Sequence, residues 1–212
     1  MNNFIENCTG VILAGGENKR MPVLKGFIEV EGKKIIERNL KIMKQCFKET
    51  FIITNQPELY SYLDAPMFGD VYDIRGPMTG VFTALLNSSE RWIFVSACDM
   101  PFINPALIRY MATERDNHDI VAPVRDNRPE PLFSFYSSRT TTSIERFILS
   151  GKRALKDFLL FYDKRVKYVT TEEIRKRDLE SRSFINLNTP DDVDQYLRPE
   201  DRLKFKERLK RR

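Results

Sequence analysis

A glycine-rich turn near the N-terminus has residue types suited to anion binding. Glycines let the backbone turn sharply and bring amide N–H groups close to a ligand. Arg20 and Lys25 follow the turn, and their charges would neutralise a triphosphate and the pyrophosphate that it releases. The turn consists of Leu13, Ala14, Gly15 and Gly16.

This turn is neither a P-loop nor a G-x-G-x-x-G fingerprint, because the Lys-Ser/Thr pair and the third glycine are missing. A plain turn with solvated basic residues is the alternative. The turn directly follows the apolar residues 10–13, which have the pattern of a buried strand. That position favours nucleotide binding.

Two polar residues follow other apolar runs, Asn55 after residues 51–54 and Asp99 after residues 92–96. A carboxylate at the end of a central strand can hold Mg²⁺ against phosphate oxygens, since Mg²⁺ prefers carboxylate, phosphate and water ligands. The alternative for Asp99 is a helix N-cap or a turn. Asp99 is therefore a candidate metal ligand.

Asp70 and Asp73 lie close to the loop at residues 76–80. A carboxylate accepts hydrogen bonds from the N1–H and exocyclic amine of guanine, or from ribose hydroxyls. Asp73 equally fits the start of a turn. This cluster is a candidate for nucleoside recognition.

Several function classes lack the residues they need. The one histidine, His118, lies in a polar stretch where we expect it to be exposed, and no Gly-x-Ser-x-Gly motif is present, so a hydrolytic triad is not expected. Cys8, Cys46 and Cys98 form no Cys-x-x-Cys pair, which argues against a disulfide framework or a structural zinc site. We interpret Cys98 as a packing residue.

The charge distribution argues against nucleic acid as a partner. The chain has 35 Lys and Arg against 30 Asp and Glu, a net charge of +5. Much of this excess lies in residues 198–212. No run approaches the roughly 18 to 20 apolar residues of a membrane span, and the first residues lack the pattern of a secretion signal. We expect a cytoplasmic protein without a membrane segment.

Strand and helix patterns alternate along the chain, which predicts one α/β domain over residues 1–197 with three layers and a mostly parallel, twisted, Rossmann-like sheet. Residues 198–212 are expected to form a basic C-terminal tail in which Leu203 and Leu209 dock on the body. The expected strands are 10–13, 51–54, 67–71, 92–96, 119–123, 131–136 and 166–169. The expected helices are 35–46, 57–63, 79–86, 105–112, two that flank Gly151, and a final one at 190–197.

These residues also resemble a known family. Residues 10–16, with Arg20-Met21, Lys25 and Gly32-Lys33, resemble the signature of sugar-phosphate-type nucleotidyltransferases. Within that superfamily the chain is most similar to the molybdenum cofactor guanylyltransferases, which make molybdopterin guanine dinucleotide. The narrower resemblance rests on Pro129-Glu130-Pro131-Leu132, Gly151-Lys152-Arg153 and Asn186-Leu187-Asn188-Thr189-Pro190.

The resemblance implies a nucleotidyltransferase fold and a role for each matching residue. Lys25, Arg20 and Asp99 would be catalytic, and Asp99 would also coordinate Mg²⁺. Guanosine would be recognised by Asn55 and Asp70. The nucleotide would also contact Leu13, Ala14, Gly15 and Gly16, and the pterin would contact Arg153, Asn186 and Asn188.

The implied reaction is the transfer of GMP from GTP to the terminal phosphate of molybdopterin, with molybdoenzyme-maturation proteins as further partners. One alternative is cytidylyl or other nucleotidyl transfer to molybdopterin or a sugar phosphate. Another is a non-catalytic protein that binds pterin and nucleotide. The family usually has Gly after Arg-Met and Asp before the lysine, whereas this chain has Pro22 and Leu24.

Overall fold

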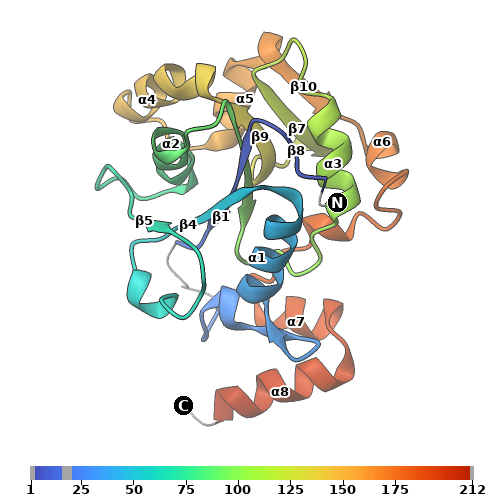
Figure 1. The fold of residues 1–212 in the computed structure, drawn as a ribbon. Coiled ribbons are helices and arrows are strands. Elements are labelled where there is room, and N and C mark those ends of the chain that lie inside the picture. The colour runs from blue at the N-terminus through green and yellow to red at the C-terminus, as the bar shows by residue number, and fades with distance from the viewer. Residues whose placement is uncertain (1–2, 16–20, 211–212) are drawn as a thin grey trace.

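A twisted sheet runs through the middle of the molecule, with helices on both faces (Figure 1). The structure is a computed structural model that describes residues 3–15 and 21–210. Along its main sheet the strands are ordered β10 (Val166–Val169), β7 (Ile120–Arg125), β9 (Phe133–Ser137), β6 (Trp92–Ala97), β1 (Cys8–Leu13), β4 (Glu49–Ile53) and β5 (Met67–Phe68). The short strand β8 (Arg128–Pro129) pairs with β7.

Strand β9 is antiparallel to both of its neighbours, and every other neighbouring pair along this order is parallel. This confirms the expected α/β fold with a mostly parallel sheet. The two strands at its centre, β1 and β6, are apolar over most of their length and almost wholly buried, as strands covered on both faces must be.

Helices α1 (Ile35–Cys46), α3 (Pro105–Thr113) and α6 (Thr171–Arg175) cover one face of the sheet. Helices α2 (Pro77–Asn87), α4 (Thr141–Leu149) and α5 (Leu155–Phe161) cover the other. The buried residues of α1 recur at intervals of three and four, which gives the helix one apolar face. A hydrophobic core therefore lies on each side of the sheet, as three layers require.

Some expected elements differ in extent. The helix expected at 57–63 is only a short 3-10 helix, and the strand expected at 67–71 ends at Phe68 because Asp70 N–H donates to the Asn55 side chain rather than to a neighbouring strand. The strand expected at 131–136 begins at Phe133. The short 3-10 helices are η1 (Lys25–Phe27), η2 (Pro57–Leu59), η3 (Ser138–Thr140), η4 (Asp163–Arg165) and η5 (Arg182–Phe184).

A third core cluster lies at the end of the molecule where α7 (Pro190–Tyr196) and α8 (Pro199–Lys210) are drawn (Figure 1). It joins these helices to the hairpin of β2 (Glu29–Val30) and β3 (Lys33–Lys34). Phe205 of α8 is 6% exposed, and the Asp201 carboxylate accepts hydrogen bonds from Glu31 N–H at 3.0 and 3.1 Å.

The segment expected as a basic tail is thus largely helix α8, packed on the hairpin, and the helix at 190–197 is not the last one. Of its two leucines expected to dock, Leu209 packs against the third cluster, whereas Leu203 is exposed. The domain boundary between residues 197 and 198 stays a prediction.

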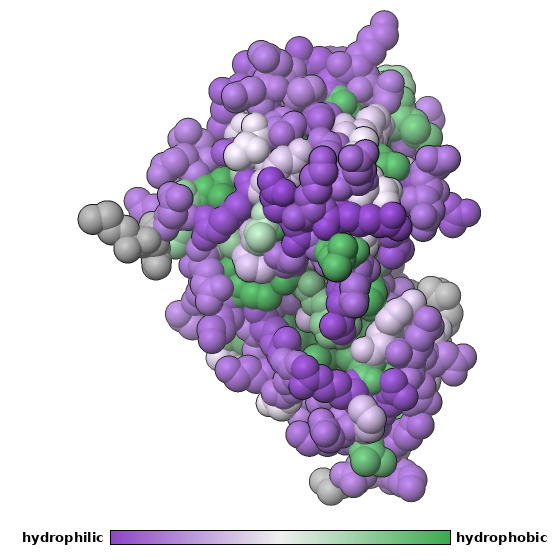
Figure 2. Space-filling view, turned by 90° about the vertical axis from the view of Figure 1, so that its right-hand side faces the viewer, coloured by the Kyte–Doolittle hydropathy of each residue, from purple (hydrophilic) through white to green (hydrophobic). Residues whose placement is uncertain are grey.

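The face of the molecule in Figure 2 is mostly hydrophilic, and many of the hydrophobic side chains visible on it lie in a hollow near its middle. Among the residues that the structure describes, no helix has the length and apolar character to cross a membrane.

Candidate active site

The candidate site lies along one edge of the sheet, where four neighbouring strands end. In the order β6, β1, β4, β5, these strands are followed by Asp99, Gly15, Asn55 and Asp70. The chain leaves β1 towards β4 and later crosses back to β6 on the other side of β1, so the connections diverge at this edge. Ligands of open α/β sheets bind at such a switch point. Three strand spacings cover about 14 Å, so these groups form a row rather than a cluster.

Lys25, Asp99 and Asn188 meet at one end of this row. The Lys25 ammonium donates to Asp99 Oδ2 at 3.1 Å and to Asn188 Oδ1 at 2.5 Å. The side chains of Lys25 and Asp99 are 22% and 14% exposed, so the ion pair is partly shielded from water. The structure therefore brings together three predicted residues from distant parts of the chain.

Backbone hydrogen bonds hold this end of the row in place. Cys98 N–H donates to the Leu13 carbonyl, which ties β6 to β1, and Leu187 N–H donates to the Asp99 carbonyl at 3.0 Å. The main-chain N–H groups of Asn188 and Thr189 both donate to the Asp192 carboxylate at 2.8 Å, at the N-terminus of α7. The segment that carries Asn188 is thus attached to both α7 and the end of β6.

Asn55 and Asp70 form a reciprocal pair at the other end of the row. Asn55 Nδ2 donates to Asp70 Oδ2 at 2.9 Å, and Asp70 N–H donates to Asn55 Oδ1 at 2.7 Å. Asp70 Oδ1 is buried and has no hydrogen-bond partner among the described residues. Burial raises the pKa of the Asp70 carboxyl, although the hydrogen bond from Asn55 opposes this. Asp73, which the sequence placed in the same candidate cluster for nucleoside recognition, is exposed.

Between the two ends lies the carboxyl terminus of β1. Ala14 N–H donates to the Ile53 carbonyl, and the Leu13 side chain lies so close to Gly80 of α2 that a Cβ there would come within 3.2 Å of it. At Gly15, in contrast, an added Cβ would meet no described atom within 4 Å. Among the atoms that the structure describes, the space next to Gly15 is therefore open. Gly16 and Arg20 lie outside the described residues.

An open cavity of about 390 Å³ lies beside the Lys25–Asp99 end of the row. Asn186 lines it, and Asn188 two positions later contacts Lys25, so one short segment connects the cavity with the Lys25–Asp99 pair. Burial raises the pKa of Glu130 in its wall, and the charges of Lys156 and Arg125 oppose this. The lining residues are Arg125, Asp126, Arg128, Glu130, Lys156 and Asn186.

Sequence reasoning did not single out Arg125, Arg128 or Lys156. They meet only because the β7–β8 hairpin and α5 both reach Asn186, and nothing in their spacing along the chain indicates this. Arg153, expected to contact the pterin with Asn186 and Asn188, is exposed in the turn before α5 and is not among the cavity's lining residues.

Cys98 was interpreted as a packing residue, and His118 was not expected to be part of a hydrolytic triad. Burial, together with the neighbouring Asp99, raises the pKa of the Cys98 thiol to about 12, as a neutral packing residue requires. His118, expected to be exposed, is half-buried, and its Nδ1 lies 3.2 Å from the Glu114 carbonyl oxygen. Within residues 3–15 and 21–210, no group of three or more His, Cys, Asp and Glu could hold a metal ion on protein ligands alone.

The sheet and its helices define an open α/β protein with polar groups along the switch point, which is where such proteins bind their ligands. Residues 10–166 match the family model for the MobA-like NTP transferase domain, and the chain belongs to this family of nucleotidyltransferases.

Named relatives agree with this assignment. The chain is 36% identical to a probable molybdenum cofactor guanylyltransferase of Pelotomaculum thermopropionicum over 87% of this chain and 89% of that one. It is 32% identical to a molybdenum cofactor guanylyltransferase of Desulfosudis oleivorans over 88% and 92%. The structure of molybdopterin-guanine dinucleotide biosynthesis protein A from Archaeoglobus fulgidus superimposes with a TM-score of 0.77 at 30% identity, covering 88% of this chain and 95% of that one.

Proposed function

We propose that this protein transfers GMP from GTP to the terminal phosphate of molybdopterin, forming molybdopterin guanine dinucleotide and pyrophosphate. The names of the relatives support this reaction. The observation that carries it is the row of groups at the sheet edge, with the Asn55–Asp70 pair at one end and the Lys25–Asp99 ion pair at the other. An extended nucleotide fits such a row with its guanine at Asn55 and Asp70 and its phosphates at Lys25.

Guanine suits the Asn55–Asp70 end because its N1–H and exocyclic amine are hydrogen-bond donors. Asp70 Oδ1 is a buried acceptor without a partner among the described residues, and such a group costs free energy until a donor reaches it. Cytosine offers only its amine as a donor on that edge. The pair therefore favours GTP over CTP in this proposal.

The Lys25–Asp99 end suits a triphosphate with its metal. Mg²⁺ keeps several waters and takes one or two carboxylates together with substrate phosphates, so a single aspartate is a sufficient protein ligand. The residues present fit this group, and Asp99 would hold it. When bound, Mg²⁺ would supply charge neutralisation for the triphosphate and the leaving pyrophosphate.

The departure from the family at Pro22 and Leu24 leaves Lys25 within reach of Asp99. Met21 and Val23, on either side of Pro22, are buried in the third core cluster, which anchors the chain just before Lys25. The lysine then reaches both Asp99 and Asn188. The geometry therefore supports a working site in spite of the two substitutions.

The acceptor would bind in the cavity beside Asn186, where its phosphate can approach the Lys25 end of the row. A phosphate oxygen attacks the α-phosphorus of GTP, a new P–O bond forms, and the bond to the bridging oxygen of the β-phosphate breaks. Because a phosphate nucleophile is already ionised at neutral pH, no general base is needed. Lys25 neutralises the charge that develops, and Arg20, which lies outside the described residues, is proposed to assist it.

The test is turnover by the purified protein with molybdopterin, Mg²⁺ and either GTP or CTP. We expect pyrophosphate release and molybdopterin guanine dinucleotide with GTP, detected by chromatography. Turnover with CTP instead would favour a cytidylyltransferase. Tight nucleotide binding without pyrophosphate release would favour a non-catalytic binding protein.

A GTP-using reaction of this kind also implies a cytoplasmic location and a hand-over of the product to molybdoenzyme-maturation proteins.

A further inference from the structure

We infer that Asn188 is a positioning residue for Lys25, and that its side-chain amide oxygen holds the lysine ammonium where the triphosphate of GTP binds. This differs from the pterin contact that the family resemblance implies for Asn188. It rests on the proposed function, because it assigns Lys25 to the phosphates.

The contacts of Lys25 carry the inference. An ammonium group has three N–H donors on a flexible four-carbon stem, so its position must be set by acceptors around it. Among the described residues, Asp99 Oδ2 accepts one hydrogen bond at 3.1 Å and Asn188 Oδ1 accepts another at 2.5 Å. The contact with the asparagine is the shorter of the two.

Asn188 is itself firmly held, which a positioning residue must be. Its main-chain N–H donates to Asp192 at 2.8 Å, in the capping interactions at the start of α7. Leu187, the preceding residue, is fully buried and its N–H donates to the Asp99 carbonyl at 3.0 Å. The main chain that carries the amide group of Asn188 is therefore held in place relative to Asp99.

The neutrality of the asparagine also matters. If Asp99 takes up Mg²⁺ with the nucleotide, its carboxylate is shared with the metal and attracts Lys25 less. Asn188 still accepts a hydrogen bond from the ammonium, and it leaves the positive charge of Lys25 for the phosphates. A carboxylate at position 188 would hold the lysine but would cancel that charge.

The experiment measures binding of GTP and of guanosine by isothermal titration calorimetry, with Mg²⁺ and without molybdopterin. Loss of one hydrogen bond to a charged group predicts that Asn188→Ala binds GTP about tenfold more weakly. Asn188→Asp should lose at least as much, although it keeps an acceptor. Guanosine binding should stay unchanged in both, because guanosine has no phosphate.

A double-mutant cycle separates a positioning role from a direct contact. In a Lys25→Met background, Asn188→Ala should cause no further loss of GTP affinity, since the lysine on which it acts is gone. Asn87→Ala, which removes a side-chain amide at the carboxyl end of α2, is the matched control and should bind GTP as the wild type does. Thermal unfolding checks each variant, and if Asn188→Ala does not fold, Asn188→Asp carries the test.

Four results would overturn the inference, the last of them together with the proposed function. Wild-type GTP affinity in Asn188→Ala, with an effect only on molybdopterin, would make Asn188 a pterin contact. Equal losses for GTP and guanosine would indicate a general disturbance of the site. An undiminished effect in the Lys25→Met background would show that Asn188 does not act through the lysine. If the wild type itself binds no GTP, the proposed function fails and the inference fails with it.

Discussion

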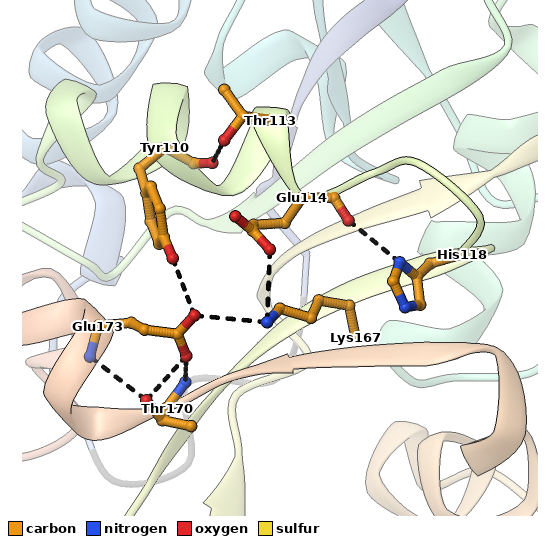
Figure 3. A network of polar contacts seen from close by, with 7 residues as sticks. All are labelled: Tyr110, Thr113, Glu114, His118, Lys167, Thr170 and Glu173. Carbon is orange, nitrogen blue, oxygen red and sulfur yellow. Dashed lines mark hydrogen bonds and ion pairs between the residues drawn. The ribbon is translucent and has the colours of Figure 1, made fainter.

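A polar network around the outermost strand, β10, predicts a measurable dependence of stability on pH (Figure 3). Glu173 of α6 accepts hydrogen bonds from the Tyr110 hydroxyl at 2.8 Å and from Thr170 N–H at 2.7 Å. Lys167 of β10 lies between two carboxylates, 3.4 Å from Glu173 and 3.3 Å from Glu114. The network thus joins α3, β10 and α6 just before the segment that leads to Asn188.

Burial alone would raise the pKa of Glu173. The hydrogen bonds from the Thr170 backbone and hydroxyl and from Tyr110, with the charge of Lys167, outweigh it and lower this pKa from an ordinary value of 4.5 to about 2. A lowered carboxyl pKa means that the folded state binds the proton less well than the unfolded state. The stabilisation is therefore complete above about pH 4.5 and is lost as the pH falls through about 2.

The size of the effect follows from the same values. A pKa lowered from 4.5 to about 2 corresponds to at most ~3.5 kcal/mol at neutral pH, at ~1.4 kcal/mol for each pH unit. The side chains of Glu173 and Lys167 are 24% and 28% exposed, so water screens part of the charge interaction. We expect ~1–2 kcal/mol for the charge of Glu173 at pH 7.

Urea unfolding of the wild type and Glu173→Gln at pH 7 and at pH 3 measures this contribution. The variant should be less stable by ~1–2 kcal/mol at pH 7, and the difference should shrink by at least about half at pH 3. Other titrating groups cancel in the comparison. Glu172→Gln, on the exposed neighbour in the same helix, is the matched control and should change little. An equal difference at both pH values would refute the argument, because it would assign the effect to packing.

Three further substitutions test the site and the C-terminal helix. Asp99→Ala should lower GMP transfer by about a hundredfold in a pyrophosphate-release assay, and a wild-type rate would remove Asp99 from the site. Asp70→Ala should weaken GTP binding about tenfold in calorimetry. Pyrophosphate, which has no base, should bind as it does to the wild type. Equal weakening of GTP and pyrophosphate binding would contradict a role of Asp70 in base recognition. Phe205→Ala should lower the free energy of unfolding by about 3 kcal/mol in urea, because this side chain is 6% exposed in the third core cluster. A change below about 1 kcal/mol would mean that α8 adds little to the fold.

Short-range patterns predicted most of the elements. Residues 35–46 were expected as a helix from the three-and-four spacing of their apolar residues, and α1 spans Ile35–Cys46. The apolar runs around Val11 and Phe94 were expected as buried strands and lie at the centre of the sheet as β1 and β6. The antiparallel insertion of β9 between β6 and β7 was not foreseen, because strand periodicity is the same in either direction.

The sequence by itself determined the order of the elements and the residues that end the strands. Asn55 and Asp99 follow buried strands, and the parallel sheet then brings both to one edge, so their role as candidates was visible in the linear chain. The narrower family was visible in the same way, from short motifs.

Only the tertiary structure decided which of these residues meet. Lys25 and Asp99 are 74 positions apart, and Lys25 and Asn188 are 163 apart, so no local spacing links them. Their contact depends on the sheet order, on the backbone bond from Leu187 to the end of β6, and on the start of α7. The packing of Phe205 of α8 into the third core cluster likewise depends on the tertiary structure. Propensity and periodicity act over a few residues, whereas these contacts form only when the whole core packs.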